Sequence, residues 1–246
     1  MTPAHAYFRR AATLDQAFRG LAGREWAARG RIATRSAADI APDATRAVLM
    51  RAKTSHRGVG ARRGLKDLVA GAADQDFLDE ICTIGGLERL ELGYPVTAAR
   101  LDGLRALKRL KFLRIDSPRN VTDFSPLLAL PSLTTLIVEN AKHMVDIEWL
   151  ADAHHLEVIG IEGGMTTSQP IRSLSPLARL RDLRALLATA VRLEEKDLFP
   201  LAECERLEYL ASARFAPRPE FEMLRNLKPG LVCTWFHPEA WGKDGP

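Results

Sequence analysis

Residues 101–138 read LDGLRALKRLKFLRIDSPRNVTDFSPLLALPSLTTLIV. Two motifs each occur twice in this stretch. The first is Leu-x-x-Leu-x-apolar, at Leu110-Leu113-Ile115 and Leu133-Leu136-Val138. The second is three apolar residues at spacing three, at Leu101-Leu104-Leu107 and Phe124-Leu127-Leu130, and it begins nine residues before each copy of the first. The constant offset predicts that the two motifs are the halves of one repeating structural unit.

The same pair of motifs continues in both directions along the chain. Copies of the first motif begin at Leu87, Leu110, Leu133, Leu156, Leu183 and Leu207, in steps of 23, 23, 23, 27 and 24 residues. Copies of the second begin at Leu78, Leu101, Phe124, Ile147, Leu174 and Leu198, always nine residues earlier. A unit of this size cannot bury its own apolar face, so it must stack on its neighbours. The sequence therefore predicts a solenoid of six full repeats.

Each motif has the period of one kind of secondary structure. Alternating apolar residues in the first motif are typical of a short strand with one buried face. Apolar residues three apart in the second are typical of a 3-10 or short helical turn, and Pro126, Pro176 and Pro200 fit its first turn, where the missing N–H costs nothing. The 27-residue step predicts that four extra residues within 163–173 project as a loop without shifting the flanking strands.

The repeat resembles the leucine-rich repeat, and in particular the short bacterial repeats of the internalin type. Residues 121–127 (VTDFSPL) and 173–177 (SLSPL) match best, and the resemblance covers residues 78–236. It implies an α/β solenoid with a parallel β-sheet on the concave face and a non-enzymatic role in protein recognition. The ninth repeat position departs from the family, because the common asparagine is replaced by Pro95, Pro118, Ala141, Gly164, Val191 and Phe215.

Charge divides the chain into two parts of opposite sign. Residues 1–70 hold 14 Lys and Arg against 5 Asp and Glu, whereas residues 71–246 hold 21 against 26. We therefore expect a basic helical extension over 1–70, with helices near 13–29 and 43–55 and an exposed basic loop over 53–66. The leucine-rich repeat domain then spans 71–246, with an N-terminal cap at 71–86, a C-terminal cap at 231–246 and a last strand over 232–236.

Composition and motifs favour a binding protein over an enzyme. No P-loop, GxSxG, HExxH or EF-hand pattern occurs, so neither a catalytic set nor a cofactor is predicted. The three cysteines lack metal-ligand spacing, and His154-His155 falls in a variable solvent turn of the repeat. The longest uncharged run, 124–138, is 15 residues, shorter than the roughly 18 a membrane span needs. We expect a bacterial-type cytoplasmic protein.

The strand positions that point away from the core define a candidate partner-binding face. The seventh position of three successive repeats holds Asp116, Glu139 and Glu162, a row of like charges that gives the fold no stability. The other outward residues predicted to bind the partner are Phe112, Arg114, Ile137, Leu187, Tyr209 and Trp235. This combination predicts a protein partner with a basic, partly apolar surface, as for a neutralising or regulatory subunit.

Two alternatives use the same residues differently. Arg119 and Lys142 follow two of the carboxylates and can neutralise them, and the basic extension can itself cover the outward apolar residues. The basic segment 46–66 instead suggests a nucleic-acid-associated protein. We do not favour nucleic acid, because no aromatic residue for base stacking lies between Arg46 and Lys66.

Overall fold

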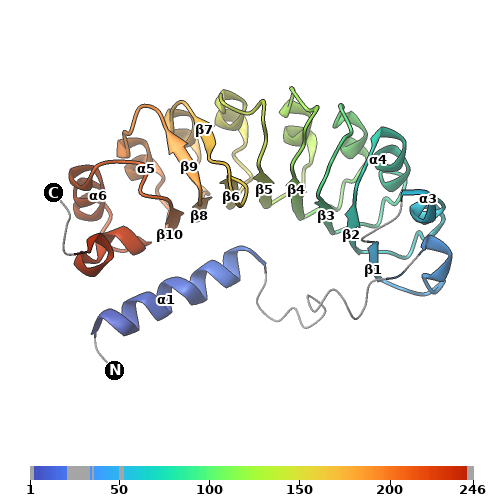
Figure 1. Cartoon of the computed structure of the whole chain (residues 1–246), viewed down its shortest axis with the longest axis horizontal. Helices are drawn as coiled ribbons and strands as arrows, with labels where there is room; N and C mark the ends of the chain where they lie inside the picture. Colours follow the sequence, from blue (N-terminus) through green and yellow to red (C-terminus); the bar gives the residue numbers. More distant parts are fainter. Residues whose placement is uncertain (1–2, 21–33, 35, 50–52, 243–246) are drawn as a thin grey trace. The chain divides into compact units, whose positions relative to one another are not determined.

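The computed structural model describes residues 3–20, 34, 36–49 and 53–242. The chain forms two compact units: unit 1 consists of Met1–Arg24 and Val145–Pro246, and unit 2 of Glu25–Met144. Both are built from the same element, a short parallel strand joined to a helical turn (Figure 1). The predicted leucine-rich repeat fold, an α/β solenoid with a parallel sheet and a helical N-terminal segment, is confirmed.

Unit 2 contains five parallel strands that pair in chain order. They are β1 (Arg46–Leu49), β2 (Asp67–Gly71), β3 (Arg89–Gly93), β4 (Phe112–Asp116) and β5 (Thr135–Glu139). The helical segments of this unit are η2 (Ala37–Asp39), α3 (Lys53–His56), η3 (Val59–Ala61), α4 (Gln75–Ile81), η4 (Asp102–Ala106) and η5 (Ser125–Ala129), where η marks a 3-10 helix.

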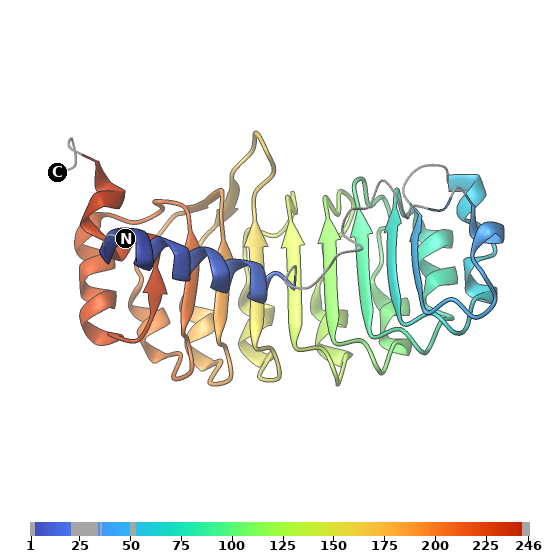
Figure 2. The ribbon, with the colours of Figure 1, turned by 90° about the horizontal axis from the view of Figure 1, so that it is seen from below.

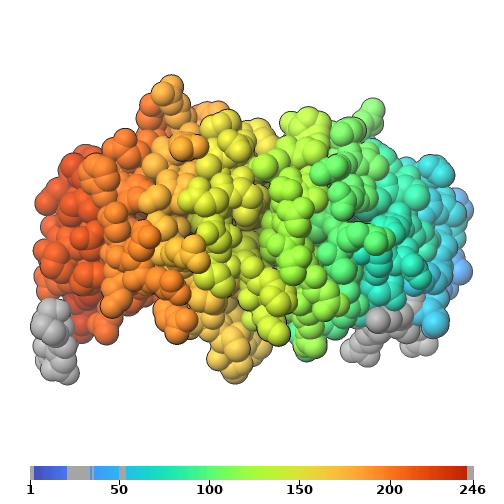
Figure 3. All heavy atoms as spheres, turned by 90° about the horizontal axis from the view of Figure 1, so that it is seen from above, coloured from blue at the N-terminus to red at the C-terminus, as the bar shows by residue number. Residues whose placement is uncertain are grey.

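Unit 1 contains four further parallel strands, paired in the order β6-β8-β10-β11. They are β6 (Val158–Glu162), β8 (Ala185–Ala188), β10 (Tyr209–Ser212) and β11 (Val232–Cys233), and a second small sheet joins β7 (Gln169–Ile171) to β9 (Val191–Leu193). Its helical segments are α1 (Pro3–Phe18), η6 (Glu148–Asp152), η7 (Ser175–Arg179), α5 (Phe199–Glu203), α6 (Arg218–Leu227), η8 (Thr234–Phe236) and η9 (Pro238–Trp241). Figure 3 shows the face formed by the helical turns, where the repeats within each unit follow one another in chain order.

The leucines of both motifs form the core between strands and helical turns. Leu113 and Leu136 of the strand motif are fully buried, and Leu104 and Leu127 of the helical motif are at most 1% exposed. Four of the helical turns, η5, η6, η7 and α5, also begin with a local cap that lies outside the two motifs. The side chains of Asp123, Asp146, Ser173 and Asp197 each accept a hydrogen bond from the backbone N–H two residues later, at 2.8 to 3.1 Å.

A left-handed residue follows several strands and replaces the missing asparagine ladder. Ala72, Ser117, Asn140 and Ala190, all at the eighth repeat position, have φ between 51° and 54°. The N–H of Ser117 donates to the carbonyl of Glu139 at 2.9 Å, and that of Ala72 donates to Gly93 at 3.2 Å. Backbone groups of the turn are thus satisfied by the next repeat, without an asparagine side chain.

The solenoid begins earlier than the sequence predicts. Strand β1 pairs in parallel with β2, and β2 pairs with β3, so the prediction of a helix over 43–55 is wrong. Residues 53–66, predicted as an exposed loop, contain the helical turns α3 and η3. The predicted cap helix near Leu78 is α4, an internal turn with two strands before it. The helix predicted at 13–29 begins instead at Pro3 and ends at Phe18, and residues 21–29 lie outside the described residues.

The inserted residues near 163–173 behave as predicted. Ile159 pairs with Leu186 and Val158 with Ala185, so β6 and β8 stay in register across the 27-residue step. The extra residues form a projecting loop that ends in β7, and the side chain of Met165 at its tip is fully exposed. The last strand is shorter than predicted: β11 ends at Cys233, and Trp235 lies in the 3-10 helix η8.

Candidate functional site

The concave face of unit 2 carries a chain of alternating charges on β3, β4 and β5. Arg89 Nη2 lies 3.1 Å from Glu91 Oε1, Glu91 Oε2 lies 3.9 Å from Arg114 Nη1, and Arg114 Nη2 lies 2.7 Å from Glu139 Oε1. Burial lowers the pKa of Arg114, but the hydrogen bond and charge of Glu139, with the charge of Glu91, outweigh it and raise the pKa. The charges on this face therefore compensate one another.

Asp116 is the carboxylate of this face that acts on Arg114 through its charge alone. It stacks in register with Glu139, as predicted. Its Oδ1 accepts a hydrogen bond from Ser117 Oγ at 2.9 Å, and no cation among the described residues forms an ion pair with it. Cations from outside this row compensate the other two carboxylates, because Arg114 pairs with Glu139 and Arg19 pairs with Glu162.

The outward apolar residues of unit 2 are less exposed than the sequence predicts. The guanidinium of Arg89 lies 3.2 Å from the ring centroid of Phe112, which is 7% exposed as a result. Ile137 is 2% exposed. The accessible part of this face is therefore polar and charged, formed by the half-buried side chains of Arg89, Arg114, Asp116 and Thr135.

The concave face of unit 1 is occupied by helix α1. Figures 1 and 2 show α1 running across strands β6, β8 and β10. Ala4 and Ala11, seven residues apart, are its buried residues. Phe18 continues the same spacing and stacks on Tyr209 of β10, with ring centroids 5.9 Å apart and planes 10° apart. One stripe of the helix thus faces the sheet.

An ion pair fixes the carboxyl-terminal end of α1. Arg19 Nη2 donates to Glu162 Oε1 at 2.8 Å, and Arg19 Nη1 also contacts Glu162 Oε2. Glu162 also accepts a hydrogen bond from the hydroxyl of Thr189, and Asp15 accepts one from Arg19 Nε at 2.8 Å. Burial lowers the pKa of Arg19, but its bonds to Glu162 and Asp15 outweigh this and raise the pKa. This bidentate pair is the strong, directional kind.

The amino-terminal half of α1 is tied to the edge of the sheet. The hydroxyl of Tyr7 donates to the carbonyl of Cys233 at 2.7 Å and accepts from its N–H at 3.2 Å. Tyr7 and Phe8 also pack against the ring of His237. Tyr7 therefore satisfies one backbone donor and one acceptor of the edge strand β11.

Cover by the extension, one of the two alternatives, is confirmed for unit 1, although the covering segment is α1 and not residues 46–66. Leu187, Tyr209 and Glu162 are 0%, 4% and 3% exposed. The sequence predicted that these three residues are accessible to a partner. With α1 in place they are not.

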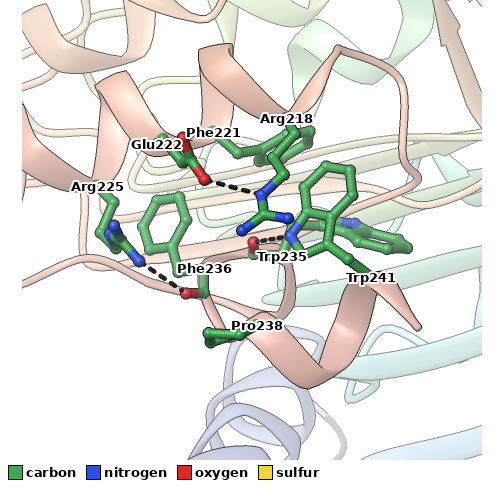
Figure 4. Close-up of a pocket in the computed structure, with 8 residues that line it drawn as sticks. All are labelled: Arg218, Phe221, Glu222, Arg225, Trp235, Phe236, Pro238 and Trp241. Atoms are coloured by element: carbon green, nitrogen blue, oxygen red, sulfur yellow. Dashed lines mark hydrogen bonds and ion pairs between the residues drawn. The ribbon is translucent and has the colours of Figure 1, made fainter. Parts of the chain in front are cut away.

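Trp235 does not belong to the concave row. Its indole N–H donates to the carbonyl of Ser212 at 2.9 Å, and its ring packs on Trp241 with centroids 5.4 Å apart. Figure 4 shows the hollow beside it, lined by Arg218, Phe221, Glu222, Arg225, Trp235, Phe236, Pro238 and Trp241. The space inside it that the centre of a water molecule can reach is about 10 Å³, roughly enough for one water molecule.

The basic segment 46–66 serves the fold of unit 2. Arg62 donates to the carbonyls of Ala37 and Ala38, at 3.3 and 3.2 Å, and Arg63 donates to that of Thr83 at 3.3 Å. Arg57 pairs with Asp74 at 3.1 Å. These three arginines are engaged within the protein, whereas Arg46 and Lys66 of the same segment are exposed.

The three cysteines and the His154-His155 pair show no sign of a catalytic or metal-binding role. Burial raises the pKa of the thiols of Cys82, Cys204 and Cys233 to about 12, so all three are protonated at neutral pH. In the described part of the chain, no three His, Cys, Asp or Glu side chains are grouped to hold a metal ion. His154 is exposed on its turn, and burial, followed by the charge of His154, lowers the pKa of His155.

Sequence reasoning missed the residues that hold α1 in place. Tyr7 and Arg19 are bonded to residues 226 and 143 positions away, which no repeat motif connects. The available signal was the seven-residue spacing of Ala4, Ala11 and Phe18, which marks one face of a helix.

Comparison with known proteins gives structural neighbours only. No protein-family model matches the sequence, and no curated protein matches it. Among solved structures, the chain is similar to internalin InlF of Listeria monocytogenes, with 18% identity over 71% of this chain and 62% of that one, and a TM-score of 0.49. It is also similar to internalin C2 of the same species, with 22% identity, 66% and 70% coverage and a TM-score of 0.48.

A leucine-rich repeat protein of Leptospira interrogans is similar at 15% identity, over 78% of this chain and 54% of that one, with a TM-score of 0.49. This chain thus spans less than two thirds of InlF and of the Leptospira protein. These neighbours include the internalins that the repeat spelling resembles, and the fold assignment rests on the strands and motifs themselves. Of the helices described, none is both long enough and apolar enough to cross a bilayer.

Proposed function

We propose that this protein is a non-enzymatic recognition module that binds a protein partner on its concave strand surface. The observation that supports it most is the docking of α1, because a concave face of this chain already binds a polypeptide through ion-pair, hydrogen-bond and aromatic contacts. Peptide and protein recognition uses the same kinds of contact.

The open part of the surface indicates what the partner supplies. On unit 2, Asp116 accepts a hydrogen bond from Ser117 and, among the residues described, forms no ion pair. A lysine or arginine of the partner fits there, which agrees with the proposed basic partner surface. The rest of the face, from Arg89 to Glu139, is balanced in charge and suits a polar contact. A regulatory subunit that occludes a partner protein is one form of this function.

The location that we propose is the cytoplasm. The three cysteines are all free and buried, which fits a reducing compartment.

The test compares two charge reversals of equal size on opposite faces. The full chain, Asp116→Arg on the concave face and Asp102→Arg on an exposed turn are used as bait in lysate of the source organism, and the captured protein is then purified. We expect the parent and D102R to bind it alike, with affinity that weakens as salt is added. D116R should bind at least tenfold more weakly. Equal binding by D116R and D102R would show that the concave face of unit 2 is not the site.

A further inference from the structure

The concave surface of unit 1 on which α1 lies, called the groove below, already holds a helix. Its outward strand positions include Gly160 on β6, Ala185 on β8 and Ala211 on β10, all of them buried under the segment that crosses them. The residues that α1 buries, Ala4 and Ala11, are equally small. Small side chains on both surfaces allow a helix axis to lie close to the sheet.

Two polar anchors mark the ends of this groove. The backbone of Cys233 binds the hydroxyl of Tyr7 at one end, and Glu162 binds Arg19 at the other. Tyr7 and Arg19 are 12 residues apart, which corresponds to about 18 Å of helix. The groove therefore recognises a helix of defined length and direction.

Glu162 is the feature that a purely structural cover would not need. It is 3% exposed, and Arg19 supplies the cation that neutralises it. Burying a carboxylate is costly unless a cation and hydrogen bonds compensate it, and an apolar residue at this position would hold α1 without that cost. A charged residue at the groove end instead selects helices that carry an arginine at the matching position.

The apolar surface that α1 buries is small, so its docking depends on the polar anchors at its two ends. Its two buried residues, Ala4 and Ala11, are small and are 8% and 5% exposed, while Phe8, Leu14 and Phe18 are half-buried. The helix has no acidic residue in its first turn and no basic residue in its last turn to stabilise its ends. A 16-residue helix is marginal in isolation, so α1 depends on the groove.

We propose that this groove is the binding site for an amphipathic helix of a partner protein, and that α1 is an intramolecular occupant that the partner helix displaces. The partner helix presents two small residues seven positions apart, an aromatic residue seven further on, and an arginine next to it, as α1 does. This inference rests on the proposed recognition function and adds the partner's structural class and its competition with α1.

The experiment measures binding of a second copy of the helix in trans. A fluorescein-labelled peptide of residues 3–20 is titrated with the full chain and with three full-chain variants. Arg19→Glu should release α1 and bind the peptide at least tenfold more tightly than the parent does. Arg9→Glu, an equal charge reversal on an exposed position of α1, should match the parent. Adding Glu162→Gln to R19E should weaken peptide binding at least tenfold again.

The other outcomes overturn the inference. If R19E keeps its circular dichroism spectrum and binds the peptide no better than the parent, α1 is a permanent part of the fold. If R19E instead forms concentration-dependent dimers without binding peptide, the groove accepts a second copy of the chain rather than a partner. Should R19E not fold, Arg19→Gln carries the same comparison with a milder change.

The purified partner separates this inference from the proposed function. Tighter binding of the partner by R19E than by the parent supports both. Equal binding by R19E and the parent, with loss in D116R, overturns the displacement of α1 and leaves the proposed function intact.

Discussion

His56 is a buried imidazole at a position that other repeats give to an apolar residue. It is 0% exposed and packs on Phe77 with ring centroids 5.1 Å apart, and neither ring nitrogen has a hydrogen-bond partner among the described residues. Burial, with the charge of Arg57, lowers its pKa from the ordinary 6.5. The unfolded chain therefore binds a proton more readily. The stability that depends on the neutral imidazole of His56 is fully present above pH 6.5. It is lost as the pH falls from there towards the lowered pKa.

Replacing this imidazole should remove that pH dependence. We expect His56→Leu to raise the free energy of unfolding by about 1 kcal/mol at pH 7.5, since a buried polar group without hydrogen bonds is lost. The drop in stability between pH 7.5 and pH 5 should also shrink. Thermal melts at both pH values measure this, with the exposed His143→Leu as the control. An unchanged drop in H56L would place the acid sensitivity elsewhere, with His155 the next residue to replace.

Neighbouring residues on β5 test the assignment of inward and outward faces. Leu136 is fully buried, so Leu136→Ala should cost about 2–5 kcal/mol of unfolding free energy. Thr135 is half-buried on the opposite face, and Thr135→Ala should cost less than about 0.5 kcal/mol. Denaturant titrations give both values. Similar costs for the two would mean that the strand faces are inverted.

At the scale of elements, the loop after β6 depends on one glycine. A Cβ at Gly163 would lie 2.3 Å from the carbonyl oxygen of Ala190 and 2.4 Å from that of Thr167. Both are backbone atoms that cannot move aside cheaply. We expect Gly163→Ala to cost about 1–3 kcal/mol, as for other steric overpacking. At Gly85 a Cβ meets nothing within 4 Å, so Gly85→Ala serves as the control. Equal unfolding midpoints in urea would mean that the loop rearranges freely.

The elements from Leu87 onward were predictable because leucine occupies most of their core positions. The two earlier repeats were not, since their strand and turn positions read Ala44-Ala47-Leu49, His56-Val59-Arg62 and Leu65-Leu68-Ala70. Alanine, histidine and arginine at these positions are also typical of a basic helical segment. The burial of His56 and the hydrogen bonds from arginines to backbone carbonyls depend on tertiary contacts, which the local sequence pattern does not reveal.

The candidate site was predictable in its register but not in its electrostatics. Period-two alternation places Asp116 beside Glu139, and the pairing of β4 and β5 confirms it. The compensating cations come from a neighbouring strand position, Arg114, and from Arg19, which is 143 residues from Glu162 in the sequence. A repeat motif reports only the repeated positions, so contributions from outside the array stay hidden.

At the scale of the whole molecule, α1 is held on the concave face of unit 1 by the ion pair between Arg19 and Glu162. Hydrogen–deuterium exchange of the α1 amides tests this most directly, in the parent, in R19E and in the reversed pair R19E with Glu162→Arg. We predict that protection of residues 8–14 is lost in R19E, because the undocked helix frays, and is largely restored in the reversed pair. Protection that is equal in all three proteins would contradict the claim that this ion pair docks α1 on the concave face.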